Sequence, residues 1–250
     1  MRRANWIIAI FISALTLTGW AWYARPVEAP DWTGVVEGLS YSPFAASENG
    51  TTDKPNPVQV ERDAAFLAHK VRAVRIYKAE GFEAVPRIAA RHDLKVTAGA
   101  EIDVDKEKNK REIQAVIDMA RNNRNINRIL VGNEALLRGN VTVEELIQYI
   151  REVRRNVRVP VSTAESAFIW LSHPELAKEV DFIALQLLPY WEQQALDSTL
   201  QYTLGSMDKI AAAFPEKKDK ILISEIGWPS SGHIRGPAEA SRPPGWLSAR

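Results

Sequence analysis

The chain has no cysteine among its 250 residues, so it forms no disulfide and offers no thiolate to a metal. Its net charge is low, +1 from 32 basic and 31 acidic side chains, and this balance lacks the basic bias of a nucleic-acid-binding protein. The four histidines are scattered without the spacing of metal ligands, and we expect helix-surface positions for them. These shortages predict no metal, no cofactor and no nucleic-acid partner.

A glycine-rich phosphate-binding turn is missing after the first expected strand. The residues there are Tyr-Ser-Pro-Phe at positions 41–44, which cannot cradle a phosphate. A doubly wound nucleotide-binding sheet is therefore the less favoured arrangement for this chain. The sequence also lacks a repeat of the solenoid kind.

The N-terminal segment carries a long apolar run. Arg2 and Arg3 precede Trp6–Ala24, which is nearly all apolar and has no charged residue. About nineteen residues at roughly 1.5 Å each span just under 30 Å, close to the thickness of a bilayer core. We expect an uncleaved signal anchor over residues 1–24 and a linker over residues 25–33, with a cleavable signal peptide as the alternative. With an anchor, the protein would cross the cell membrane (the inner membrane) once. The remaining chain would lie on the extracytoplasmic side.

After the linker, apolar β-branched runs alternate with segments of helical period, in units of about thirty residues. Strands are expected at Val35–Tyr41, Val71–Tyr77, Leu94–Glu101, Asn127–Gly132, Val159–Thr163, Asp181–Gln186 and Ile221–Glu225. Helices are expected at Val58–Lys70, Phe82–His92, Lys106–Asn123, Thr142–Asn156, Pro174–Glu179 and Thr199–Phe214. This alternation predicts parallel βαβ units and favours an α/β fold of the (β/α)8 TIM-barrel type over residues 34–250.

The expected barrel is one unit short. Only twenty-five residues follow Glu225, and residues 232–250 are rich in proline with little periodicity. A further helix, strand and helix would need roughly fifty residues at the usual barrel size. The sequence therefore predicts a barrel that is truncated after its seventh strand, with its C-terminal end incomplete.

Two of the expected strands end in a glutamate. Glu134 follows the apolar run at 128–132, and Glu225 ends the run at 221–225. The C-terminal ends of barrel strands face the active-site mouth, so both carboxylates are expected there. Glycoside hydrolysis needs such a pair, because one carboxyl group protonates the leaving oxygen while the other attacks the anomeric carbon or activates water.

The sequence around these glutamates resembles glycoside hydrolase family 17, the β-1,3-glucanases and related transglucosylases, including bacterial membrane-anchored members. The strongest motifs are Val-Gly-Asn-Glu at 131–134 and Ser-Glu-Ile-Gly-Trp-Pro-Ser at 224–230, supported by Val-Arg-Ile-Tyr at 74–77 and Leu-Pro-Tyr-Trp at 188–191. The resemblance covers residues 35–232. It implies a retaining enzyme that hydrolyses or transglucosylates β-glucan oligosaccharides or polysaccharides.

The resemblance also implies roles for individual residues. Glu134 matches the general acid/base, Glu225 the nucleophile, and Asn133 the residue that binds the sugar 2-hydroxyl. The positions that match the lining of the sugar subsites are Tyr41, Arg75, Tyr77, Tyr190 and Trp228.

Other acidic residues are weaker candidates. Glu165 and Glu192 lie near strand ends, and binding of sugar hydroxyls is one interpretation of each. The acidic cluster at 101–105 is expected to be a solvated loop, with a cation site as the alternative. Two rival functions stay open, a non-catalytic glucan-binding module and an inactive truncated fragment, and the sequence indicates no particular protein partner.

Overall fold

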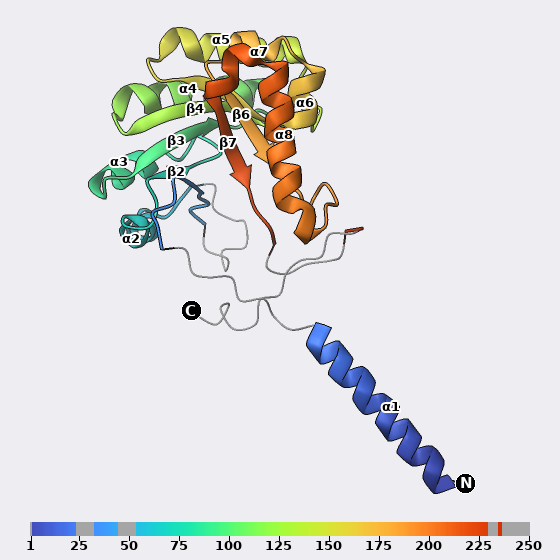
Figure 1. Ribbon diagram of the computed structural model, residues 1–250. Helices are drawn as coiled ribbons and strands as arrows, with labels where there is room; N and C mark the ends of the chain where they lie inside the picture. Colours follow the sequence, from blue (N-terminus) through green and yellow to red (C-terminus); the bar gives the residue numbers. More distant parts are fainter. Residues whose placement is uncertain (1, 24–32, 45–53, 230–234, 237–250) are drawn as a thin grey trace.

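The computed structural model describes residues 2–23, 33–44, 54–229 and 235–236. At residues 2–4 and 23 it describes the backbone only. Within these residues seven parallel strands lie side by side in the order of the chain (Figure 1). The strands are β1 Leu39–Ser40, β2 Ala73–Arg75, β3 Lys95–Ala100, β4 Ile126–Asn133, β5 Val161–Ser166, β6 Ile183–Leu187 and β7 Ile221–Ile226. The sequential parallel order confirms the TIM-barrel type of fold.

Helices connect successive strands and cover the outer face of the sheet (Figure 1). They are α2 Pro57–Leu67, α3 Ala84–Arg91, α4 Lys106–Asn122, α5 Val143–Asn156, α6 Ala167–Ser172, α7 Leu176–Glu179 and α8 Thr199–Ala213, with the 3-10 helices η1 Leu196–Ser198 and η2 Pro215–Lys220. All the expected strands and helices are present, and α6 is a helix that the sequence pattern did not predict. The expected fifth strand was placed too early, because β5 continues to Ser166 and so includes Glu165.

Local sequence signals explain where two of the covering helices begin. Thr142 and Glu145 form the expected capping box at the start of α5, each side chain bonding the backbone N–H of the other residue. Asp105 caps α4 by accepting from the backbone N–H groups of Glu107 and Lys108 at 2.9 and 3.1 Å. Asp105 therefore serves as the N-cap of this helix.

The core lies between the sheet and its helices. Ile129, Ile183 and Leu185 of the central strands are fully buried, and each such side chain contributes about 1.5–3 kcal/mol relative to exposure. Trp170 of α6 is also fully buried and donates its indole N–H to the carbonyl oxygen of Ala184 at 3.2 Å. This packing holds β4, β5 and β6 rigidly under the ends that carry the polar residues.

The first and seventh strands do not pair with each other within the described residues. Leu39 of β1 is 44% exposed, and Leu222 and Ile223 of β7 are only partly buried. A hollow of about 730 Å³ lies between the two strand edges. The described barrel is therefore nearly closed, with its opening between β1 and β7.

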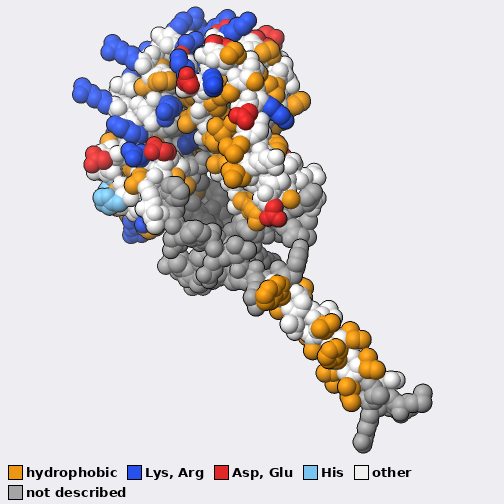
Figure 2. Space-filling view, in the orientation of Figure 1, with side chains coloured by type: hydrophobic (Ala, Val, Ile, Leu, Met, Phe, Trp, Pro, Cys, Tyr) orange, Lys and Arg blue, Asp and Glu red, His pale blue; other side chains and the backbone are white. Residues whose placement is uncertain are grey.

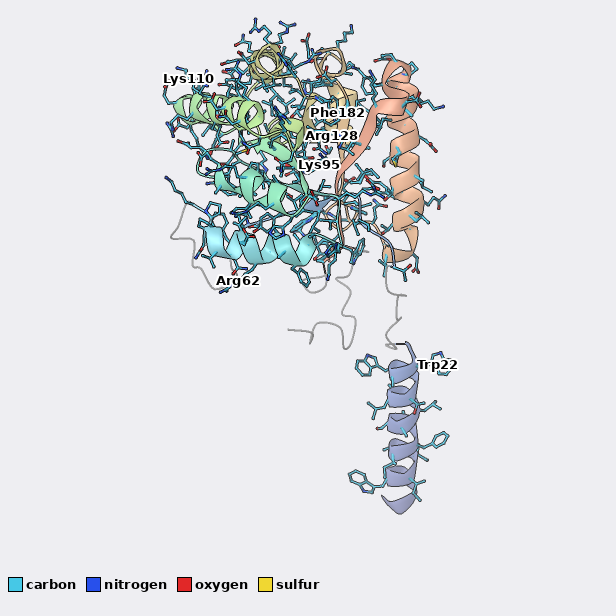
Figure 3. All side chains as sticks on the ribbon, turned by 90° about the vertical axis from the view of Figure 1, so that its left-hand side faces the viewer. Trp22, Arg62, Lys95, Lys110, Arg128 and Phe182 are labelled. Atoms are coloured by element: carbon cyan, nitrogen blue, oxygen red, sulfur yellow. The ribbon has the colours of Figure 1, made fainter. Side chains whose placement is uncertain are left out.

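Helix α1, Arg2–Tyr23, contains a stretch from Asn5 to Trp22 that is long and apolar enough to cross a membrane. None of this stretch is buried, and its large side chains, Trp22 among them, project outward from the helix (Figure 3). A signal sequence near the N-terminus would have the same length and composition. The helix is thus compatible with both the anchor and the signal peptide.

Candidate active site

Glu134 sits on a turn of unusual backbone geometry at the end of β4. Gly132 has φ 87° and Glu134 itself has φ 55°, a conformation that costs a non-glycine residue about 1–3 kcal/mol. The backbone N–H of Glu134 donates to the carbonyl oxygen of Ala164 in β5 at 2.8 Å, which fixes the turn. The Glu134 side chain is 17% exposed and pairs with Arg138 at 2.8 Å. The turn thus holds one carboxylate at the rim of the barrel.

Glu225 is surrounded by hydrogen-bond donors at the end of β7. Its Oε2 atom accepts from Arg75 Nη1 at 3.4 Å, from the Tyr77 hydroxyl at 3.2 Å and from Gln186 Nε2 at 3.3 Å. The pairing of β6 with β7 shifts register at this point, so that Glu225 lies opposite Gln186. These three donors fix the orientation of the carboxylate.

Arg75 links the two glutamate motifs from inside the barrel. Its Nη2 donates to Asn133 Oδ1 at 2.5 Å, and its Nη1 donates to the carbonyl oxygen of Ser224 at 3.0 Å. The side chain is only 7% exposed, and burial lowers the pKa of Arg75 while the nearby Glu225 and Glu134 carboxylates oppose that shift. Arg75 therefore holds the ends of β2, β4 and β7 in fixed relation.

The amide of Asn133 has its orientation set by two donors. Oδ1 accepts from Arg75 and also from Gln186 Nε2 at 3.0 Å, so the oxygen must face inward. No described residue accepts a hydrogen bond from the Asn133 Nδ2 group. This N–H donor is consequently available to a hydroxyl group bound in the cleft.

Both glutamates line one cleft of about 880 Å³ at the C-terminal ends of the strands. Its lining residues are Tyr77, Glu101, Ile102, Asp103, Asn133, Glu134, Arg138, Asn140, Gln186, Leu188, Trp191 and Glu225. The lining is rich in hydrogen-bonding groups and includes an aromatic face. Such a surface suits a polyhydroxylated ligand such as a sugar chain.

Three aromatic residues form one side of the site. Tyr190 is buried and contacts Trp191 and Trp228 edge to face, with ring centroids 5.5 and 5.7 Å apart. Trp191 is 57% exposed, lines the cleft and has the Arg235 guanidinium over its ring at 4.2 Å. Trp191 thus offers an exposed aromatic ring to the cleft, and the buried Tyr190 packs against this ring.

Tyr41 and Glu165 do not line the cleft. The Tyr41 hydroxyl donates to Asp63 at 2.7 Å, and burial together with this carboxylate raises the pKa of Tyr41. Glu165 is fully buried, and its Oε1 accepts from the backbone N–H of Leu136 at 3.0 Å. Both were expected to contact sugar; Glu165 instead supports the turn that carries Glu134.

The burial of Glu165 has a consequence for stability. Burial is the largest cause that raises its pKa to about 7 from an ordinary 4.5, although the neighbouring backbone N–H groups oppose the shift. The folded state binds the proton of this carboxyl group more tightly than the unfolded state, so protonation stabilises the fold. This stabilisation is complete below about pH 4.5 and is lost as the pH rises to about 7. The shift corresponds to roughly 3 kcal/mol at most.

We therefore expect Glu165→Gln to increase the free energy of unfolding at pH 8 by up to about 3 kcal/mol and to change it little at pH 4.5. Urea unfolding of the variant and the parent at both pH values measures this difference. Glu144→Gln, at an exposed carboxylate of α5, is the control and should show no pH-dependent gain. An equal effect of Glu165→Gln at both pH values would contradict the raised pKa.

The acidic loop after β3 lies in the cleft but is already neutralised in part. Lys108 Nζ pairs with Glu101 at 2.9 Å and with Asp103 at 3.0 Å. No group of three or more His, Asp or Glu side chains suited to a metal occurs in the part of the chain that the structure describes. The loop is a solvated ion-pair cluster at the edge of the cleft.

Several residues that line the cleft were not among the predicted site residues, and Gln186, Trp191 and Arg138 are three of them. Gln186 ends an apolar strand, Trp191 belongs to a recognised motif, and Arg138 stands four residues after Glu134. Gln186 could have been found by the signal that identified Glu134 and Glu225, a polar side chain at the end of a buried strand. Arg138 had no such signal, because its contact with Glu134 depends on the turn geometry.

Comparison with known proteins gives matches to glucan-active enzymes. Residues 38–244 match the family model described as BtgE/BtgC glycoside hydrolase domain. Two similar proteins are a probable glucan endo-1,3-β-glucosidase of Aspergillus terreus and a glucan endo-1,3-β-glucosidase of Emericella nidulans. Both are 27% identical, over 81% and 79% of this chain and 34% and 33% of their own lengths. The chain thus spans about a third of the length of these curated relatives.

A solved structure also resembles the barrel. It is an active-site mutant of a Rhizomucor miehei β-1,3-glucanosyltransferase in complex with laminaritriose. It superposes with a TM-score of 0.70 and 25% identity, covering 82% of this chain and 76% of that one.

Proposed function

Because the chain belongs to the BtgE/BtgC glycoside hydrolase domain family, we propose that it cleaves or transfers β-1,3-glucan by a retaining double displacement. Glu225 is the nucleophile and Glu134 the general acid/base in this proposal. The observation that carries it is the joint lining of one cleft by both carboxylates, with Glu225 held by Arg75, Tyr77 and Gln186.

In the first step, an Oε atom of Glu225 attacks the anomeric carbon while Glu134 donates its proton to the departing glycosidic oxygen. The carbon–oxygen bond of the glucan breaks, and a glycosyl ester forms on Glu225. Asn133 lines the same cleft, and its Nδ2 group, with no acceptor among the described residues, donates to the sugar 2-hydroxyl in this step. This hydrogen bond strengthens as the oxocarbenium-like charge develops.

In the second step, Glu134 acts as a base. It removes a proton from water or from a sugar hydroxyl, and the resulting oxygen nucleophile attacks the anomeric carbon and releases Glu225. Arg75, Tyr77 and Gln186 stabilise the carboxylate as it departs. Water as the acceptor gives hydrolysis, and a second glucan chain gives transfer.

Incubation of the full chain with laminari-oligosaccharides, followed by mass analysis of the products, tests the proposal. Shorter products indicate hydrolysis and products longer than the substrate indicate transfer. The absence of any change in length, for a protein that shows cooperative thermal unfolding, would contradict an enzymatic function and favour a glucan-binding role.

Helix α1 anchors the domain to a membrane in this proposal, with the cleft on the extracytoplasmic side. The support is the uncharged apolar stretch from Asn5 to Trp22, preceded by Arg2 and Arg3. N-terminal sequencing of the protein extracted from membranes should read from the first residues of the chain. A mature protein that begins near Pro30 would instead identify a cleaved signal peptide.

A further inference from the structure

The near-neutral net charge of this chain conceals a separation of charge along the barrel. Six segments bring the chain from a helix into the next strand, and together they carry fourteen Lys and Arg against five Asp and Glu. These segments are residues 68–72, 91–95, 121–128, 154–160, 178–181 and 215–220, and we call them the basic end. Figure 2 shows Lys and Arg side chains gathered on the upper and left-hand faces of the barrel.

The opposite end of the barrel, which carries the cleft, has the reverse bias. Residues 77–83, 101–107 and 133–145 follow strands and contain nine acidic side chains and three basic ones. The basic end is thus separated from the catalytic glutamates by the length of the barrel and takes no part in binding the glucan.

Helix dipoles explain part of this distribution. Basic residues in the last turn of a helix, such as Arg91 in α3 and Arg121 in α4, interact favourably with the negative end of the dipole. Arg124 and Arg158 lie beyond the ends of α4 and α5, and Lys218 lies in η2; all three are exposed and have no acidic partner in the described part of the chain. Stabilisation of helices does not account for Arg124 and Arg158.

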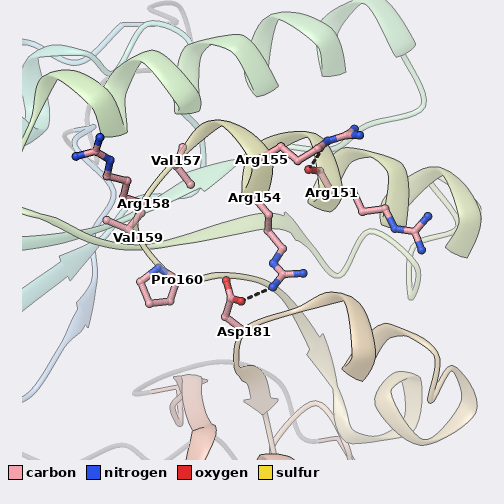
Figure 4. A pocket seen from close by; sticks show the side chains of 8 residues that line it. All are labelled: Arg151, Arg154, Arg155, Val157, Arg158, Val159, Pro160 and Asp181. Atoms are coloured by element: carbon pink, nitrogen blue, oxygen red, sulfur yellow. Dashed lines mark hydrogen bonds and ion pairs between the residues drawn. The ribbon is translucent and has the colours of Figure 1, made fainter.

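A hollow of about 540 Å³ lies within the basic end, between α5 and the start of β6 (Figure 4). Asp181 neutralises Arg154 there across 2.6 Å. Arg155 and Arg158 also line the hollow, and Arg155 donates to the carbonyl oxygen of Arg151, not to a carboxylate. The hollow therefore keeps guanidinium groups available to an external anion.

The chain enters the barrel at this same end. Val36 accepts from Arg72 N–H at 2.9 Å and donates its own N–H to Lys70 at 2.8 Å, which places the residues before β1 beside the start of β2. Ten residue steps separate Tyr23, the last residue of α1, from Thr33. Such a stretch spans at most about 35 Å when fully extended. A membrane that holds α1 is therefore within reach of the basic end.

We propose that the basic end docks on anionic phospholipid headgroups of the membrane that holds α1, so that the glucan cleft points away from the bilayer. The inference rests on the anchoring proposed above. Each Lys or Arg near an anionic surface contributes about 1 kcal/mol, and the tether raises the local concentration of headgroups. Lipid fits better than nucleic acid because the cations are spread over six segments along the sheet and do not lie along one element.

The test uses the full chain in lipid nanodiscs, whose two sides are both accessible. Because the chain has no cysteine, a single reporter can be placed by Asn122→Cys at the basic end or by Val104→Cys at the cleft end. The 17 residues of α4 separate these positions by roughly 25 Å. Energy transfer from a dye on the cysteine to an acceptor on the lipid headgroups reports which end approaches the bilayer.

We expect energy transfer from the dye on Asn122→Cys to be at least about two-fold greater in discs that contain phosphatidylglycerol than in discs of phosphatidylcholine alone. High salt should abolish this difference between the two lipids. The excess should disappear in a variant with Arg124→Gln, Arg158→Gln and Lys218→Gln. It should persist in the control with Lys54→Gln, Lys106→Gln and Lys110→Gln, which removes the same charge at the cleft end.

Each other outcome opposes the proposal. Equal transfer in both lipids, greater transfer from Val104→Cys, or equal loss in both triple variants overturns docking by the basic end. Displacement of this end from anionic discs by duplex DNA at an equal phosphate concentration assigns the surface to nucleic acid and also overturns it. Failure of the chain to elute with discs of either lipid contradicts the anchor itself, and the docking with it.

Discussion

Glu225→Ala is expected to lower turnover of laminari-oligosaccharides on the order of 10⁴-fold to 10⁶-fold, as occurs when a catalytic nucleophile is removed. The substitution deletes the atom that bonds to the anomeric carbon. It leaves Arg75, Tyr77 and Gln186 facing an empty space. Azide should enter that space and attack the sugar directly, because the cavity is lined by donors that suit an anion. The expected product is a glycosyl azide of inverted configuration.

The stereochemistry of this azide adduct, determined by NMR, identifies the nucleophile. Glu144→Ala removes an exposed carboxylate from α5 and serves as the control, with turnover close to that of the parent. Glu225→Gln keeps the size of the side chain and should be as inactive as the alanine variant while retaining its unfolding midpoint. Normal turnover by Glu225→Ala would reject the assignment.

Glu134→Ala is expected to lower turnover of natural glucan by about 10²-fold to 10⁴-fold, the usual contribution of general acid–base catalysis. Substrates with a good leaving group need no proton in the first step, so that step should be spared. The glycosyl ester on Glu225 should then accumulate, because its hydrolysis still needs a base. Burst kinetics with an aryl glucoside would show this accumulation.

Azide distinguishes Glu134→Ala from Glu225→Ala even when both are inactive on glucan. In Glu134→Ala it attacks the glycosyl ester and gives a product of retained configuration. Arg138→Gln is the matched control, because it removes the ion pair with Glu134 but leaves the carboxylate in place. An inverted azide from Glu134→Ala would mean that the two roles are exchanged.

The two glutamates act together because Arg75 joins their motifs across long stretches of chain. Its partners Asn133 and Ser224 lie 58 and 149 residues away in the sequence. Gln186 adds a second connection, since its Nε2 donates to both Asn133 and Glu225. The geometry of the site therefore depends on the relative positions of four strands.

The sequence alone determined the α/β barrel type, the strand order and the ends of β4 and β7 that carry the glutamates. These follow from local patterns: apolar runs of strand length, amphipathic helical segments, and caps such as Thr142 with Glu145. The C-terminal ends of buried barrel strands face the barrel mouth, so a polar residue at such an end is expected there. This is why Glu134 and Glu225 were predicted to lie together, whereas Asn133, Arg75 and Tyr77 were added by the resemblance to glycoside hydrolase family 17.

Tertiary structure decided which side chains point into the cleft and how charge is distributed over the surface. Glu165 turned inward because β5 runs to Ser166, and Tyr41 turned to Asp63 of α2. Gln186 reached Glu225 through a register shift between β6 and β7 that has no sequence signature. The basic end gathers six segments that a net charge of +1 does not reveal, because separation in space is a property of the folded chain.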